Sequence, residues 1–287
     1  MRTRIITAVV LLSAAMCWLF VADYAFFTMG ALLIYMVGAW EMGPLLGFKS
    51  KIPFLILATA AACALFIVAP PGEFVSGGGI PSFVYAIIAS GMLVWLGCIP
   101  LVLQYPRWLG WHENRILTAL MGLLMLVPFL ESLLVLRSFL YHREFYRGAL
   151  VVLSVMALVW CADSGAYFCG RFLGRTPMLP AVSPKKTLEG LLGGLVAGVL
   201  GLYIFTKLQW YGNYAENTQV LMFSGILAII FSVEGDLVES MLKRLAGIKD
   251  SGKIFPGHGG MLDRIDSQLA ALPTFISSYC LLNWILH

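Results

Sequence analysis

The chain contains 287 residues, of which 60% are hydrophobic and 12% are charged, and its formal net charge at pH 7 is +4. Roughly a quarter of the residues of an ordinary soluble domain are charged, so this composition excludes a soluble globular domain. It is typical of a protein embedded in a lipid bilayer.

Nine mainly apolar segments are long enough to form membrane-spanning helices. Such a helix needs about 20 residues, because the hydrocarbon layer is about 30 Å thick and a helix rises about 1.5 Å per residue. The segments lie near residues 5–22, 25–45, 53–70, 81–104, 116–136, 148–169, 188–206, 219–246 and 268–286. The sequence therefore predicts an all-α, polytopic integral membrane protein with about nine transmembrane helices.

The first segment has a second interpretation as a cleaved signal peptide, because Arg2 and Arg4 precede it. The apolar run continues through Trp18 and Phe20 without an A-x-A cleavage site, and another hydrophobic segment follows closely. We therefore interpret the first segment as a membrane span.

Lysine and arginine are unevenly distributed between the two sides that nine spans predict. With a cytoplasmic N-terminus, only Arg137, Arg143, Arg147 and Lys207 fall outside, and the other fifteen of the nineteen basic residues fall on the cytoplasmic side. Cytoplasmic loops of membrane proteins carry such an excess. We therefore expect the N-terminus in the cytoplasm and the C-terminus on the opposite side.

The chain is predicted to form one integrated membrane domain whose two halves differ in character. Residues 1–147 contain about five apolar spans with short loops, and the sequence suggests no partners for Asp23, Glu41 and Glu131. Residues 148–287 contain about four spans and three polar segments, all on the predicted cytoplasmic side. We expect the chemistry of the protein in this second half.

The first polar segment is CADSGAYFCGRFLGR, residues 161–175, at the end of the sixth span. Asp163, Tyr167 and Arg171 are spaced i, i+4, i+8 and so share one face of a helix. An ionisable group about two turns inside a span is costly, which favours a functional role. The alternative is an internal salt bridge that only fixes helix packing.

The second polar segment is SPKKTLEG, residues 183–190, which opens the seventh span. Ser183 followed by Pro184 predicts an N-cap and a first helical residue, which leaves free backbone N–H groups facing the cytoplasm. Such a helix start attracts phosphate. Three further polar side chains lie beside it, namely Lys185, Lys186 and Thr187. The alternative is a basic membrane anchor with a good cap.

The third polar segment covers residues 233–267 and begins on the eighth span. On a helix, one stripe would hold Asp236, Glu239, Ser240, Lys243 and Arg244. Asp236 would lie roughly 16 Å before a helix end near Gly247. A carboxylate at that depth requires a polar cavity. A structural ion-pair ladder could explain Glu239 and Lys243, but it does not explain the loop that follows.

That loop, KDSGKIFPGHGGMLDRIDS at residues 249–267, concentrates glycines and charges. Glycine lets the backbone approach a ligand closely. Asp263 and Asp266 share a face if a helix has begun, and with Asp236 they could form a carboxylate site for Mg²⁺, which prefers oxygen ligands. His258 could be a general base, but we favour a role as a hydrogen-bond donor to phosphate or as a hydrogen-bonding residue of the loop.

Carboxylates beside basic residues and glycines at the mouth of a membrane cavity indicate phosphate-transfer chemistry with a lipid as one partner. Metal ions would neutralise the developing charge, and no covalent nucleophile is needed if the attacking group is itself a phosphate. The sequence has no Walker loop, dinucleotide fingerprint or zinc-protease helix. The alternative is a transporter, which would carry polar groups near the midplane and on both sides, whereas here they gather on one side.

The segment SMLKRLAGIKDSGKIFPGHGGMLDRID, residues 240–266, resembles the signature of the phosphatidate cytidylyltransferase family, also called CDP-diacylglycerol synthases. The shared pattern is S-x-x-K-R, K-D, H-G-G and D-R-x-D, with no departure at these positions. The segments ADSGAYFCGRFLGR and SPKKTLEG, the chain length and the many spans are also similar to that family. An enzyme that consumes CDP-diacylglycerol is a further alternative, but the D-G-x-x-A-R core of such enzymes is absent.

The resemblance implies an enzyme that transfers CMP from CTP to phosphatidic acid and gives CDP-diacylglycerol and pyrophosphate. It implies a requirement for Mg²⁺, with K⁺ as a candidate second metal ion. Members are enzymes of the bacterial inner (plasma) membrane and tend to be homodimers, so we expect both properties here. No nucleic-acid partner is expected.

The resemblance also implies roles for individual residues. The expected metal ligands are Asp236, Asp263 and Asp266, and Asp163 is an additional candidate. The expected catalytic residues are these three aspartates with Lys243 and Arg244. The expected substrate-binding residues are Ser183, Lys185, Lys186, Thr187, Ser240, Lys249, Asp250, His258, Gly259, Gly260 and Arg264. Among them, the residues at 185–187 would contact the nucleotide.

Overall fold

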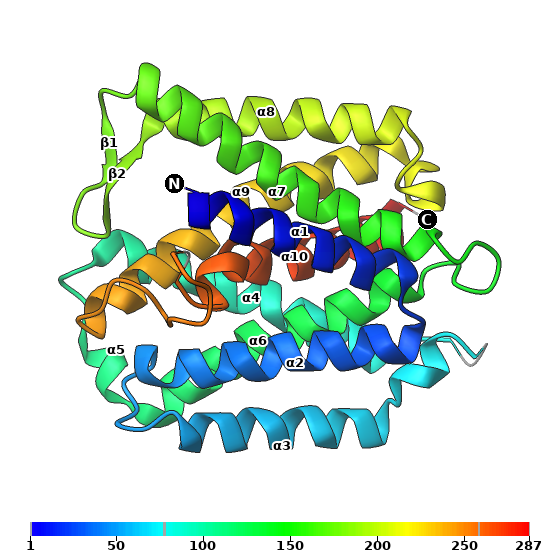
Figure 1. Cartoon of the computed structure of the whole chain (residues 1–287), viewed down its shortest axis with the longest axis horizontal. Helices are drawn as coiled ribbons and strands as arrows, with labels where there is room; N and C mark the ends of the chain where they lie inside the picture. Colours follow the sequence, from blue (N-terminus) through cyan, green and yellow to red (C-terminus); the bar gives the residue numbers. More distant parts are fainter. Residues whose placement is uncertain (1, 77–78, 258, 287) are drawn as a thin grey trace.

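The structure is a computed structural model that describes residues 2–76, 79–257 and 259–286. These residues form long α helices, two 3-10 helices and one two-stranded hairpin (Figure 1). The α helices are α1 (Arg2–Val21), α2 (Tyr24–Leu45), α3 (Ile52–Val68), α4 (Ser82–Gln104), α5 (Gly110–Glu113), α6 (Arg115–Ser138), α7 (Arg147–Phe172), α8 (Leu188–Lys207), α9 (Thr218–Leu245) and α10 (Leu262–Leu286). The remaining elements are η1 (Pro71–Phe74), η2 (Gly212–Ala215), β1 (Pro177–Leu179) and β2 (Ser183–Thr187).

Each predicted span coincides with a helix of the described chain. Seven helices are long and apolar enough to cross a membrane, namely α2, α4, α6, α7, α8, α9 and α10. The other two are shorter candidates, since α3 has 17 residues and the apolar helix found within α1 covers Leu12–Val21. The protein is therefore an all-α, multi-pass membrane protein, and the count of nine spans stays a prediction.

The helix α8 illustrates how these segments meet both lipid and protein. Leu192, Val196 and Leu200 follow one another at every fourth residue and are 62%, 61% and 57% exposed. On the inner side, a Cβ placed on Gly194 would lie 2.8 Å from the carbonyl oxygen of Ala162 in α7. Glycine therefore lets the two backbones approach closely, as is common between membrane helices. The apolar outer face suits contact with lipid.

The helix α6 lies in the core of the bundle and packs against α2, α4, α7 and α10. Its residues Leu126, Leu130 and Leu134 are fully buried. A helix that is apolar on all sides is expected in such a position. The helix α10 packs against α4, α6 and α9. Its start, which carries Asp263 in the first turn and Asp266 in the second, is therefore held in place by the bundle.

The polar segments gather at one end of the bundle, which holds the β1–β2 hairpin, α5 and the loop from α9 to α10 (Figure 1). We call this the polar end. The helix α1 begins at the polar end, and α10 ends at the opposite end (Figure 1). The α9–α10 loop starts where predicted, because α9 ends at Leu245 and Gly247 follows with a φ of +69°.

The seventh span begins at Leu188 as predicted, but the helix cap predicted for it at Ser183 is wrong. The sequence predicts Ser183 as N-cap and Pro184 as the first helical residue, but both lie in β2, which pairs antiparallel with β1. Thr187 is the N-cap, because its hydroxyl accepts a hydrogen bond from Gly190 N at 3.1 Å and α8 begins at Leu188. Pairing with β1 satisfies the backbone ahead of the helix, and the local Ser-Pro signal carries no information about that partner.

Candidate functional site

A cavity of about 530 Å³ lies at the polar end between α7, the hairpin, α8 and α9, and we call it the hairpin cavity. Asp163, Tyr167 and Arg171 all line it, so the predicted shared face of α7 is confirmed. Arg171 Nη1 donates to Tyr167 Oη at 2.8 Å. No ion pair joins Asp163 to Arg171 in the described part of the chain. The packing salt bridge considered for this face is therefore not formed.

The hairpin presents predicted phosphate-binding residues to the hairpin cavity. Lys185, Lys186 and Thr187 all line it. The hairpin is held against α8 because the Glu189 carboxylate, in the first turn of α8, accepts hydrogen bonds from the backbone N–H groups of the two residues before β1, at 3.1 and 3.2 Å. The short strand pairing alone would not fix the hairpin on the bundle.

The predicted stripe of polar residues on α9 contacts the β1–β2 hairpin. The Asp236 carboxylate pairs with Lys186 Nζ at 2.7 Å through Oδ2 and accepts from Ser240 Oγ at 3.3 Å through Oδ1. Arg244 points to the hairpin, where its Nε donates to the carbonyl oxygen of Val182 at 3.4 Å. The stripe therefore holds the hairpin at two points along α9.

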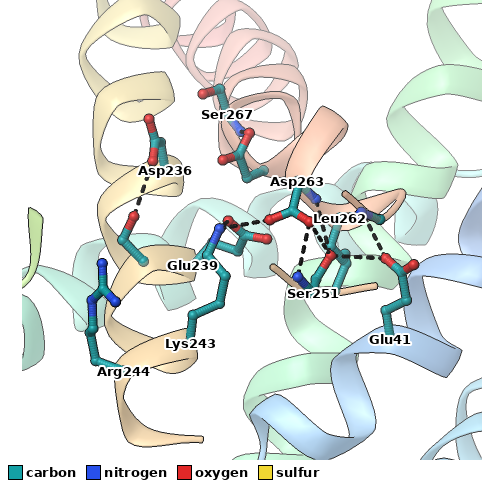
Figure 2. A network of polar contacts seen from close by, with 12 residues as sticks. Glu41, Asp236, Glu239, Lys243, Arg244, Ser251, Leu262, Asp263 and Ser267 are labelled. Atoms are coloured by element: carbon teal, nitrogen blue, oxygen red, sulfur yellow. Dashed lines mark hydrogen bonds and ion pairs between the residues drawn. The ribbon is translucent and has the colours of Figure 1, made fainter. Parts of the chain in front are cut away.

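Further along α9, Lys243 joins two helices. Its Nζ pairs with Glu239 on the same helix and with Asp263 Oδ1 on α10 at 2.8 Å (Figure 2). All three side chains are largely buried. The ion-pair ladder considered for Glu239 and Lys243 is present, and the contact with Asp263 extends it across to α10.

The Asp263 carboxylate is enclosed by the α9–α10 loop. Its Oδ2 accepts from Ser251 N at 2.9 Å, Ser251 Oγ at 2.9 Å and Gly260 N at 2.8 Å, and its Oδ1 faces Lys243. The helix α10 begins one residue before Asp263, so a negative charge here also complements the helix dipole. The loop can fold around the carboxylate because Gly259 adopts a φ of +79°, which favours glycine.

A second cavity of about 690 Å³ lies between α9, the α9–α10 loop and the start of α10, and we call it the loop cavity. Asp236, Asp263 and Asp266 all line it. Asp236 also lines the hairpin cavity and therefore stands at the junction of the two. Other predicted site residues on the lining of the loop cavity are Lys243, Lys249, Asp250, Gly259 and Arg264.

Some predicted site residues lie outside the linings of these two cavities. Ser240 and Gly260 still contact the aspartates, at Asp236 and Asp263 respectively. Arg244 contacts the hairpin, and Ser183 lies within β2. His258 falls outside the described residues, and its predicted role stays a prediction.

The loop cavity is lined by four acidic and four basic side chains. The acidic residues at positions 236, 239 and 263 each pair with a lysine, whereas Asp266 has no ion pair within the described residues. In this conformation, no three carboxylate, histidine or cysteine side chains of the described chain are arranged to hold a metal ion. Mg²⁺ usually takes one or two carboxylates and fills its other positions with water and phosphate. Asp236 and Asp266 fit that requirement because both face the loop cavity.

Sequence reasoning missed two residues of this network, Glu41 and Ser251. Glu41, on α2, accepts hydrogen bonds from Ser251 Oγ at 3.0 Å and from Leu262 N at 2.9 Å (Figure 2). Glu41 and Ser251 lie 210 positions apart in the chain. The only signal in the sequence was an acidic residue inside an apolar span, and this does not indicate which residue it contacts.

These features define a class of protein. It is a multi-pass membrane protein in which carboxylates, lysines and a glycine-rich loop enclose two adjoining cavities at one end of a helical bundle. Lysines are suited to binding phosphate groups, and free carboxylates are suited to binding hard cations.

The sequence model of the Cytidylyltransferase family matches residues 2–282, and the chain belongs to this family. A Haemophilus influenzae protein named phosphatidate cytidylyltransferase is 33% identical over 97% of this chain and 98% of its own length. A Pseudomonas aeruginosa protein of the same name is 37% identical over 99% of this chain and 98% of its own length. A Synechocystis protein of that name is 49% identical over 47% of this chain and 45% of its own length.

Proposed function

We propose that this chain is a phosphatidate cytidylyltransferase, which transfers CMP from CTP to phosphatidic acid and releases CDP-diacylglycerol and pyrophosphate. The observation that carries the proposal is the similarity of nearly the whole chain to the H. influenzae and P. aeruginosa proteins of that name. Two adjoining cavities with cationic side chains on their linings support it, because both substrates carry phosphate groups.

In the proposed reaction, a phosphate oxygen of phosphatidic acid attacks the α-phosphorus of CTP. A new P–O bond forms there, the bond to the bridging oxygen breaks, and pyrophosphate leaves in line with its electron pair. The chain supplies position and charge rather than a covalent nucleophile. Lys185 and Lys186 would hold phosphates of the nucleotide, and Lys243 and Lys249 would hold phosphates that enter the loop cavity.

Asp236 stands where the two cavities adjoin, so it would face the reacting phosphates. Mg²⁺, when bound, would neutralise negative charge on the transferred phosphate, and Asp236 and Asp266 would hold it. Asp263 and Asp163 remain predicted ligands, and K⁺ remains a predicted second ion. Asp263 Oδ2 accepts three hydrogen bonds, so Asp263 would act as a ligand through Oδ1, which accepts only from Lys243.

We also propose nine spans in a bacterial inner (plasma) membrane, with the polar end and the N-terminus in the cytoplasm and the C-terminus on the opposite side. CTP is water-borne, so the mouth of the site must face the cytoplasm, while phosphatidic acid can enter sideways with its acyl chains in lipid. The excess of basic residues in the loops of this end supports that orientation. Catalysis would depend mainly on residues 148–287, and the working form would be a homodimer.

One assay tests the activity. Purified protein is incubated with phosphatidic acid, Mg²⁺ and each of the four nucleoside triphosphates in turn, and the lipid products are separated. We expect a nucleotide-activated lipid and pyrophosphate with CTP. The absence of product with every nucleotide would reject the proposal. Solute flux in proteoliposomes without CTP consumption would favour the transporter alternative.

A further inference from the structure

Glu41 is a buried carboxylate that no cation accompanies in the described part of the chain. It lies near the C-terminal end of α2, is 1% exposed, and forms none of the ion pairs found among the described residues. A buried charge is costly unless hydrogen bonds compensate it. Its Oε2 accepts from Leu262 N, at the start of α10, and from Ser251 Oγ. The helix start adds a favourable dipole.

Ser251 connects Glu41 to Asp263. The Ser251 hydroxyl lies 3.0 Å from Glu41 Oε2 and 2.9 Å from Asp263 Oδ2, and the Ser251 backbone N–H also donates to Asp263 (Figure 2). One hydroxyl hydrogen is therefore shared between two carboxylates. Through Ser251, the N-terminal half of the chain thus contacts Asp263, which lines the loop cavity.

Glu41 also limits which residues fit at two positions of the α9–α10 loop. A Cβ at Gly252 or at Gly260 would collide with the Glu41 carboxylate. Gly260 N in turn donates to Asp263 Oδ2 at 2.8 Å. The backbone of the loop can approach Glu41 and Asp263 together only because neither position carries a side chain.

The end of α2 that carries Glu41 is itself fixed to the bundle. Thr118 Oγ1 and Arg115 Nη1, both on α6, donate to the carbonyl oxygen of Leu46 at 3.1 and 2.9 Å. His112, on α5, lies 3.0 Å from the carbonyl oxygen of Leu45 through its Nε2. Glu41 therefore projects from a rigid support.

We propose that Glu41 is a positioning residue of the catalytic site. It lines neither the hairpin cavity nor the loop cavity, so it acts through Ser251 and the first turn of α10 by holding the loop and Asp263 opposite Asp236. The proposal rests on the proposed function for its effect on turnover, but the anchoring itself is independent of the reaction. Support of this kind fixes the geometry of groups that face the substrate.

The test compares Glu41→Ala, Glu41→Gln and Ser251→Ala in the full-length protein in detergent micelles. Glu131→Gln is the matched control, because Glu131 is equally buried at 1% exposure and lies on α6 away from the loop. Two quantities are measured: the steady-state rate with CTP and phosphatidic acid, and hydrogen exchange at the backbone amides of Ser251, Gly260 and Leu262. These amides donate to Asp263 or to Glu41.

For Glu41→Ala we expect kcat to fall about 10²-fold with the KM for CTP within threefold of wild type, since a small misplacement of reacting groups has an effect of this size. Exchange at the three amides should accelerate at least tenfold. Glu41→Gln keeps an acceptor oxygen and should recover kcat to within about tenfold of wild type. Glu131→Gln should leave both quantities unchanged.

Wild-type exchange at these amides in Glu41→Ala would overturn the anchoring, and a normal kcat would overturn the positioning role. If Glu41→Ala does not fold, Ser251→Ala decides, and wild-type kcat and exchange in that variant would overturn the proposal. If wild-type protein forms no CDP-diacylglycerol, the proposed function fails. Hydrogen exchange would still show whether Glu41 holds the loop and the start of α10 in place.

Discussion

Asp236 and Asp263 line the same cavity, but the chain holds them differently. Asp263 accepts hydrogen bonds from two backbone N–H groups, one hydroxyl and one lysine, and its surroundings are tied to α2 through Ser251. Asp236 contacts Lys186 and, at a longer 3.3 Å, Ser240. Asp263 is held by four donors of its own chain, whereas Asp236 has two contacts and more capacity to accept a further donor or a cation.

The supports behind the two carboxylates also differ. Asp263 lies in the first turn of α10, which is packed inside the bundle. The lysine partner of Asp236 comes from β2 of a hairpin that carries exposed residues and is held by a few hydrogen bonds. We infer that the α10 side of the site is preformed, and that the hairpin side can adjust as substrates enter.

The largest effect is expected from Asp263→Asn. The amide cannot accept at all the positions that the carboxylate now uses, and the charge that faces Lys243 is lost. Turnover should be abolished at every Mg²⁺ concentration in protein that remains folded, and exchange at the Ser251 and Gly260 amides should accelerate. Near-normal CDP-diacylglycerol formation by the purified variant would remove Asp263 from the catalytic site.

Asp236→Asn should show the effect of the carboxylate charge without a change in the structure of the α9–α10 loop. The variant keeps the size of the side chain but removes the negative charge at the junction of the two cavities. We expect kcat/KM to fall by about 10²–10³-fold, the size of effect seen when one charge-stabilising group is removed from a catalytic site. Exchange at the Ser251 amide should match wild type, unlike in Asp263→Asn. Accelerated exchange would show that the two carboxylates are not held independently.

Lys186→Met should act mainly on nucleotide binding. Losing one charged contact to a phosphate should raise the KM for CTP about tenfold, because hydrogen bonds to charged groups contribute about 1.5–3 kcal/mol and partial exposure weakens this one. Lys207→Met is the control, since this lysine lies at the other end of α8, over the Tyr203 ring. An unchanged KM in Lys186→Met would place the nucleotide elsewhere.

The sequence could predict the helices because lipid leaves a spanning chain few options. Backbone groups must pair within the segment, so a long apolar run such as 188–206 has to be a helix, and α8 covers Leu188–Lys207. The i, i+4, i+8 spacing on α7 likewise predicted a shared face, and Tyr167 and Arg171 are hydrogen-bonded there. Both predictions depend only on local geometry.

The missed features depend on contacts between distant parts of the chain. The hairpin that replaces the predicted cap at Ser183 requires pairing with Pro177–Leu179. The contact of Glu41 with Ser251 requires α2 to lie beside a loop that follows 210 positions later. No local pattern encodes either contact, because a serine-proline pair and a single buried acid have many possible partners.

The smallest effect is expected from Glu189→Gln, which loosens the hairpin without touching Asp236. Glu189 accepts from Arg175 N and Thr176 N, and the amide keeps only one acceptor oxygen. The KM for CTP should rise about two- to fivefold, because the contacts are exposed to solvent and act on the nucleotide only through the hairpin, which reduces the roughly 1.5–3 kcal/mol of a hydrogen bond to a charged group. Exchange at the Ser251 amide should not change.

A double variant shows whether Glu189 acts through Lys186. If its role is to hold the lysine at the hairpin cavity, Glu189→Gln should have no further effect on KM in the Lys186→Met background, because the two side chains then act in series. Multiplied effects in the double variant would contradict this. They would mean that the hairpin contributes other contacts to the nucleotide, with Lys185 and Thr187 as the nearest candidates on the same cavity lining.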